Sequence, residues 1–77
     1  MFDYSICSEA DEGIFKKQCL ALENKIKGLI KNDILIDVDE SKIQEYQLGA
    51  KRIVVYNDYN IGAVYIKSEV ELTQYFK

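Results

Sequence analysis

The stretch from Arg52 to Ile66, RIVVYNDYNIGAVYI, contains two short apolar runs around a polar centre. This pattern predicts a β-hairpin in which Asn57 to Asn60 form the loop and Tyr56 lies opposite Ile61. Successive strand residues point to opposite faces, so the two sides follow from the pairing. One side is aliphatic and carries Ile53, Val55, Val64 and Ile66. The other, the tyrosine side, carries Val54, Tyr56, Ile61, Ala63 and Tyr65.

Neither side of this hairpin is polar, so both sides need a cover. The aliphatic side is the better core, because branched side chains interlock with an apolar helix and have no polar atom to satisfy. The tyrosine side is then left over. We expect a partner protein, a second copy of the chain or a C-terminal helix to dock there.

An amphipathic helix is the expected cover for the aliphatic side, and we place it near residues 9 to 31. Its apolar residues recur at helical spacing: Phe15, Cys19, Leu22, Ile26, Leu29 and Ile30. The opposite side is polar and carries Lys16, Lys17, Glu23, Asn24, Lys25 and Lys27. Ser8 followed by Asp11 indicates the N-terminal cap.

Two further strands are predicted, and a third segment is ambiguous. Phe2 to Cys7 alternates as a half-buried strand does, and Ile34 to Val38 is short and rich in β-branched residues. In residues 41 to 48, a capping box of Ser41 and Gln44 would suit a two-turn helix. We slightly favour a strand over Lys42 to Gln47, because few apolar contacts would support so short a helix.

The chain ends in a segment, Ser68 to Phe76, that predicts a short helix. Ser68 and Glu71 form a capping-box pattern, and Leu72, Tyr75 and Phe76 share one side. The predicted fold is therefore a single α+β domain over residues 1–77. It has an antiparallel sheet of three to five strands, one long amphipathic helix on one face and a short C-terminal helix.

Charge and composition narrow the classes of partner. Ten Lys and Arg against thirteen Asp and Glu give a net charge of −3, which argues against a nucleic-acid or anionic-membrane binder. A partner with a basic surface fits better. The N-terminal residues MFDYSICSEADE lack the basic and apolar regions of a signal peptide, so we expect a cytoplasmic, non-membrane protein. In that compartment Cys7 and Cys19 are expected to be free thiols.

The residue types argue against catalysis and bound cofactors. The chain has no His, the commonest general base and metal ligand. An acidic cluster comprises Asp33, Asp37, Asp39, Glu40 and Glu45. Starting at Asp37, a calcium loop requires Gly where Lys42 stands and Glu where Leu48 stands, so that motif fails. A looser metal site on Asp37 and Asp39 is the lesser alternative to a solvated acidic edge. We predict no enzyme, no cofactor and no metal.

The best functional hypothesis is a small acidic protein-binding module. Tyrosines are enriched at interface hot spots, and a rim of carboxylates speeds encounter with a cationic surface. By analogy of surface type, we expect an inhibitor that masks a basic partner, as immunity proteins and antitoxins mask nuclease toxins. The predicted anchors are Tyr56, Tyr59 and Tyr65, and the predicted electrostatic contacts are Asp37, Asp39, Glu40 and Asp58.

Two alternatives to this hypothesis stay open. In the first, the chain is a homodimeric structural or regulatory subunit whose tyrosine side is covered by a second copy. In the second, the tyrosines stack on single-stranded nucleic acid while the helix lysines neutralise phosphates. The acidic net charge disfavours the second alternative.

Overall fold

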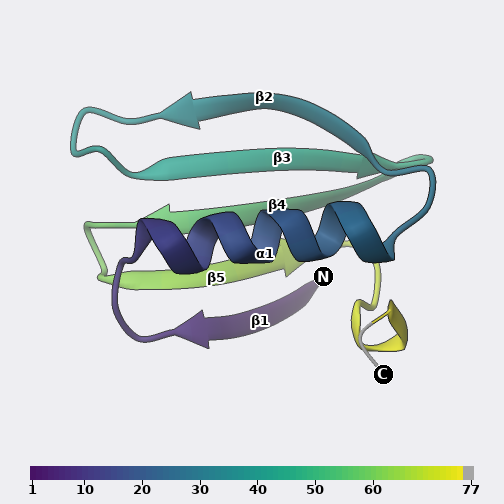
Figure 1. The fold of residues 1–77 in the computed structure, drawn as a ribbon, viewed down its shortest axis with the longest axis horizontal. Helices are drawn as coiled ribbons and strands as arrows, with labels where there is room; N and C mark the ends of the chain where they lie inside the picture. The colour runs from purple at the N-terminus through teal and green to yellow at the C-terminus, as the bar shows by residue number, and fades with distance from the viewer. Residues whose placement is uncertain (76–77) are drawn as a thin grey trace.

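Five strands form one antiparallel sheet, and a single long helix crosses one of its faces (Figure 1). The computed structural model describes residues 1–75. The elements are β1 (Phe2–Cys7), α1 (Glu12–Lys25), β2 (Ile30–Ile36), β3 (Lys42–Leu48), β4 (Lys51–Asp58), β5 (Ala63–Ser68) and a 3₁₀ turn η1 (Thr73–Tyr75). The predicted α+β class, the antiparallel sheet and the helix on one face are confirmed.

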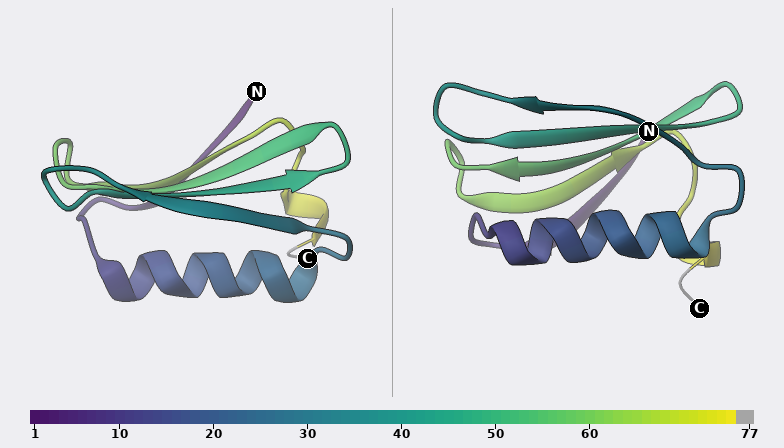
Figure 2. Two further views of the ribbon diagram at one scale, coloured as in Figure 1. Left: turned by 90° about the horizontal axis from the view of Figure 1, so that it is seen from above. Right: turned by 45° about the horizontal axis from the view of Figure 1, so that its top comes forward.

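The order of strands across the sheet is β1-β5-β4-β3-β2, so the first two strands of the chain form its two edges. Helix α1 connects these edges, and β2 to β5 follow as a meander. Figure 2 shows α1 and η1 on the same side of the sheet. The opposite face has no cover within residues 1–75.

The core lies between α1 and the sheet, and it is the predicted aliphatic side of the hairpin. Its buried residues are Phe15, Cys19, Leu22, Ile26, Tyr46, Ile53, Val55, Ile66 and Leu72. Tyr46 is fully buried, and its hydroxyl donates to Glu23 Oε2 at 2.6 Å. Burial and this hydrogen bond raise the pKa of Tyr46 far above its usual value, so Tyr46 stays neutral in the core.

The helix is shorter at both ends than the predicted residues 9 to 31, since it covers only Glu12–Lys25. Asp11 is the N-cap, and its carboxylate accepts the Ile14 N–H at 3.0 Å. The Asp11 N–H donates to Asn57 Oδ1 on β4, which fixes the start of the helix against the sheet. At the other end the helix stops at its C-cap Ile26, whose backbone is extended with φ −109° and ψ 110°. Gly28, with φ 79°, lies in the turn that leads to β2.

The register of the β4–β5 hairpin also differs from the prediction. Tyr56 pairs with Tyr65, four residues beyond the expected Ile61, and the loop is residues 59 to 62. The Asp58 carboxylate starts this turn by accepting the Asn60 N–H, and Gly62 completes it with φ 68°. Because a shift of four is even, the strand residues keep their predicted faces. Ile61 is the exception, since it lies exposed in the loop.

Residues 42 to 48 form strand β3, so the favoured alternative for this segment is confirmed. Strand β2 starts four residues earlier than predicted, at Ile30, because the helix ends sooner. The predicted short C-terminal helix is present as the single 3₁₀ turn η1, so it is shorter than the predicted Ser68 to Phe76, of which Phe76 lies outside the described residues. Ser68 ends β5 and its hydroxyl bonds to Val70, so Ser68 does not cap a helix.

The C-terminal segment packs on the helix side of the sheet. Leu72 is buried in the core, and its N–H donates to the Tyr4 hydroxyl at 2.8 Å. Tyr75 packs against the same core, whereas Phe76 lies outside the described residues. Residues 68 to 75 therefore do not cover the tyrosine side, which removes one of its three expected covers.

Candidate functional site

The open face, defined as the side of the sheet opposite α1, carries one row of side chains that crosses all five strands. The registers place the members of this row next to one another in the order Leu35, Ile43, Tyr56, Tyr65 and Ser5. Cross-strand neighbours on one face are in contact distance. From Leu35 to Tyr65 the row is therefore a continuous apolar and aromatic strip on an uncovered surface, and it ends at the polar Ser5.

Tyr56 and Tyr65 stack at the centre of this strip. Their ring centroids are 4.6 Å apart and the ring planes differ by 11°. The Tyr65 hydroxyl donates to Asp58 Oδ2 at 3.0 Å. The Tyr65 ring is therefore fixed by the stack on its face and by the hydrogen bond at its hydroxyl. Burial and the Asp58 carboxylate raise the pKa of Tyr65 to about 12. Tyr65 is thus a neutral, preoriented donor across the physiological range.

An acidic pocket opens beside the two rings, where the β2–β3 and β4–β5 turns meet. It is lined by Tyr56, Tyr65, Asp37, Asp39, Asp58, Ser41, Ile43, Lys42, Asn57 and Asn60. Its volume is about 170 Å³, several times the space that one water molecule occupies. Five of the seven predicted contact residues meet in this pocket, from two turns and the strands between them.

Ser41 holds the two turns together, and sequence reasoning missed it. Its hydroxyl is buried and accepts the Tyr59 N–H at 2.8 Å, which ties the β2–β3 turn to the β4–β5 turn. Its own N–H donates to Asp39 Oδ1 at 3.0 Å. This hydrogen bond lowers the pKa of Asp39 and keeps the carboxylate ionised. The only signal in the sequence was the S-x-x-Q pattern, which indicates a helix cap and not a turn-to-turn contact.

Tyr59 and Glu40, the other two predicted contacts, lie in a neighbouring hollow. That hollow is lined by Glu12, Ile36, Glu40, Lys42 and Tyr59, and it faces the helix side of the sheet. Glu40 has φ 69°, and this left-handed residue completes the β2–β3 turn. The structure therefore does not bring Tyr59 and Glu40 together with the stacked tyrosines.

The pocket carboxylates are not neutralised by the ion pairs of residues 1–75, which are Lys31–Glu23, Lys42–Glu12 and Arg52–Glu45. Lys42 lines the pocket, but its ammonium pairs with Glu12 on the helix side. Three carboxylates that lack an ion-pair partner within residues 1–75 line a pocket beside an aromatic stack. Such a pocket suits an organic cation, which gains charge-assisted hydrogen bonds and cation–π contact. A guanidinium or ammonium group on a side chain has this chemistry.

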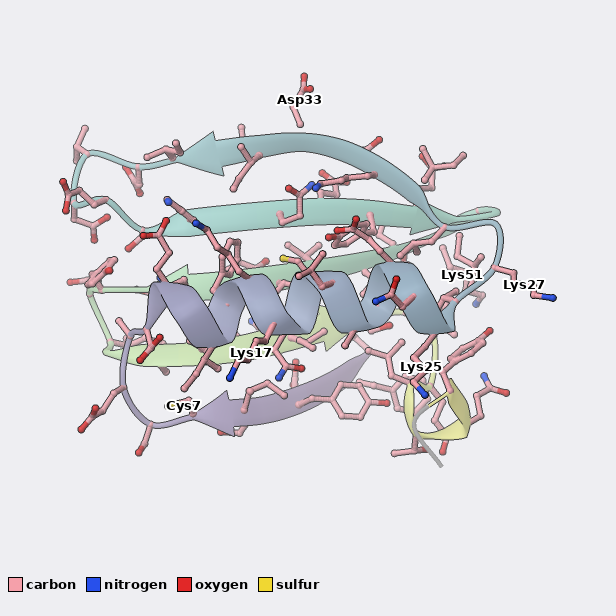
Figure 3. All side chains as sticks on the ribbon, viewed as in Figure 1. Cys7, Lys17, Lys25, Lys27, Asp33 and Lys51 are labelled. Carbon is pink, nitrogen blue, oxygen red and sulfur yellow. The ribbon has the colours of Figure 1, made fainter. Side chains whose placement is uncertain are left out.

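The helix lysines do not belong to this site. Lys17 and Lys25 extend from α1, and Lys27 follows it (Figure 3). Because α1 covers the face opposite the stacked tyrosines, the sheet separates these lysines from Tyr56 and Tyr65. A nucleic-acid strand stacked on the tyrosines would therefore lack the helix lysines for its phosphates.

No family model, curated protein or solved structure matches this chain. Among residues 1–75, no three or more Cys, Asp or Glu side chains gather closely enough to hold a metal ion. Within the same residues, no helix has the length and apolar character needed to span a membrane.

Replacing Asp58 with Asn is expected to lower the pKa of Tyr65 from about 12. The amide retains the oxygen that accepts the Asn60 and Ile61 N–H groups, so the turn should persist. The substitution removes the negative charge of Asp58, which disfavours ionisation of the Tyr65 hydroxyl. Part of the rise should remain, because burial is the larger cause. An NMR titration of the Tyr65 ring checks this, and an unchanged pKa would show that Asp58 has no influence.

The same titration bears on stability at high pH. The pKa of Tyr65 is higher in the folded state than its ordinary value of 10.0, so the unfolded chain loses this proton first. The contribution of Tyr65 to stability is then complete below about pH 10 and is lost as the pH rises through about 12. The loss should be smaller in Asp58→Asn.

Proposed function

We propose that this chain is a small acidic protein-binding module that masks a basic surface of a partner protein. The observation that carries the proposal is the acidic pocket, where three carboxylates that take no part in the ion pairs of residues 1–75 lie beside the Tyr56–Tyr65 stack. An uncovered apolar strip runs from the pocket across the sheet. This combination of aromatic centre and charged rim is typical of protein interfaces.

A Lys or Arg side chain of the partner enters the acidic pocket in this proposal. Its cationic head bonds to a carboxylate of the lining, which offers Asp37, Asp39 and Asp58, while its aliphatic stem packs on the tyrosine rings. The ring pair is already stacked and hydrogen-bonded, so little conformational freedom is lost on binding. The net charge of −3 adds long-range attraction that speeds encounter.

The pocket carboxylates resemble phosphate groups, and this resemblance indicates the class of partner. A cluster of anionic oxygens at a rigid surface competes with phosphate groups for basic residues. We therefore propose an inhibitor of the immunity-protein or antitoxin type, whose partner is a basic protein such as a nuclease toxin. The pocket supports the basic character of the partner, and the nuclease is the narrower part of the proposal.

An affinity capture from the source cells with three matched baits tests this function. The baits are the native chain, Tyr65→Ala and Lys17→Ala, whose changed side chains lie at the pocket and on the outer helix respectively. We expect the native chain and Lys17→Ala to enrich one basic protein that Tyr65→Ala does not retain. Equal recovery on all three baits, or an enriched protein with an acidic surface, would contradict the proposal.

A further inference from the structure

Strand β2 leaves an apolar edge of the sheet unpaired. Among residues 1–75 it pairs only with β3, and its last three residues are exposed by 43% at Ile34, 60% at Leu35 and 63% at Ile36. Proteins usually blunt such edges with prolines, charges or bulges. The bulge in β2 lies between Lys31 and Ile34, so Ile34 to Ile36 remain regular. This short segment is a template for another strand.

The backbone groups of Ile34 and Ile36 point outward along this edge. The Asp37 N–H donates inward to Ser41 O at 2.8 Å, and Leu35 pairs with Ile43. Backbone groups alternate between the two sides of an antiparallel strand. The N–H and C=O groups of Ile34 and Ile36 therefore face away from β3 and have no partner strand within residues 1–75.

An apolar groove lies beside the same edge on the helix side. It runs between α1 and β2, and its apolar lining is Phe15, Cys19, Leu20 and Ile34. Its polar lining is Gln44, Glu23, Lys16, Lys31 and Lys42, of which Lys31 pairs with Glu23 and Lys42 with Glu12. Leu20 is 57% exposed at the rim of this groove. An added strand would place alternate side chains next to this groove and next to Leu35 on the open face. Main-chain hydrogen bonds and side-chain burial would then act together.

We propose that the free edge of β2 accepts an extended strand from the basic partner, with an apolar centre and Lys or Arg at both ends. The inference rests on the proposed function in taking the partner to be basic. Asp33 points outward past the edge (Figure 3), and Asp37 follows the other end. The apolar segment is thus flanked by two carboxylates, which complement cations at the two ends of an incoming strand.

The same charges disfavour a second copy of this chain as the occupant. Antiparallel self-pairing centred on Leu35 would bring Asp33 of one copy opposite Asp37 of the other, twice. Centring on Ile36 would bring Asp33 opposite Asp39. Like charges directly opposite one another destabilise a sheet. Self-pairing centred on Ile34 would have to continue through the bulge between Lys31 and Ile34, where β2 is not a regular strand.

A synthetic peptide of alternating Val and Thr with two Lys at each end tests this inference directly. We expect it to shift the backbone NMR signals of β2 and to slow hydrogen exchange at the Ile34 and Ile36 amides. A peptide with Glu in place of Lys should bind at least tenfold more weakly. A peptide N-methylated at every Val and Thr should not bind, because neither of its edges can then complete the ladder.

Changes to the chain supply the matched controls. Ile34→Pro removes an outward N–H that β3 does not use, and prolines are tolerated at such edge positions. It should abolish peptide binding, whereas Ile34→Ala should retain most of it. The N-methylated peptide gives the same test if Ile34→Pro fails to fold. No shift in β2, or equal binding of the Lys and Glu peptides, overturns the inference. A dimer of the native chain that Ile34→Pro dissociates would also overturn the inference, because a second copy would then occupy the edge of β2.

This result is independent of the capture experiment. If the peptide fails while capture still depends on Tyr65, the strand inference falls and the proposed function stands. If the peptide binds β2 while capture ignores Tyr65, the acidic pocket is not the masking site.

Discussion

Leu22→Ala is expected to lower the free energy of unfolding by about 2 to 5 kcal/mol. Leu22 is fully buried in the C-terminal half of α1, within the core that the helix forms with the sheet. Truncation removes its transfer free energy and leaves a cavity. A domain of this size holds roughly 3 to 5 kcal/mol in total, so much of the variant should be unfolded at room temperature. Urea denaturation followed by circular dichroism measures the loss.

Leu20→Ala is the matched control for this prediction. Leu20 lies two residues earlier on the same helix but is 57% exposed. The same chemical change should alter the free energy of unfolding by no more than about 0.5 kcal/mol. Equal losses at the two positions would mean that α1 does not bury the face described here.

The faces of the sheet could be predicted from the sequence because side-chain alternation survives errors in the turn. The predicted hairpin loop was misplaced, yet Val55 still faces the core and Tyr56 the open face. The turn itself could not be placed, since Asn57 and Asp58 both suit a loop. Asn57 is instead buried in β4, where its side-chain oxygen accepts the Asp11 N–H. That contact spans most of the chain and leaves no local pattern.

The candidate site was predictable in its residue types but not in its grouping. Asp37, Asp39 and Asp58 were expected to act together, and their meeting in one pocket depends on Ser41 accepting the Tyr59 N–H. Sequence spacing could not separate them from Glu40, which the turn places in another hollow. Ile34 to Ile36 lie within the predicted strand, but the sequence pattern does not give the strand order that places β2 at an edge of the sheet.

Tyr65→Ala is expected to weaken the complex with the captured partner by about 2 kcal/mol, the loss typical of a hot-spot residue. The change removes one ring of the stack and the hydroxyl that meets Asp58. The chain itself should stay folded, because Tyr65 lies on the open face and outside the core. Circular dichroism and urea denaturation check the fold. Unfolding of the free variant would mean that Tyr65 is a structural residue.

Tyr65→Phe separates the ring from the hydroxyl. Phe retains the stack on Tyr56 and loses only the hydrogen bond to Asp58. We expect this variant to lose less affinity than Tyr65→Ala, since the ring supplies most of the contact area. Losses of equal size would assign the interaction to the hydroxyl instead.

The most direct test of the acidic pocket as a protein-binding site is the dissociation constant of the captured partner, measured by titration calorimetry. The native chain and the outer-helix variant Lys17→Ala should give the same value. Tyr65→Ala should raise it about 30-fold, which corresponds to about 2 kcal/mol. A dissociation constant that Tyr65→Ala leaves within twofold of the native value would contradict the account.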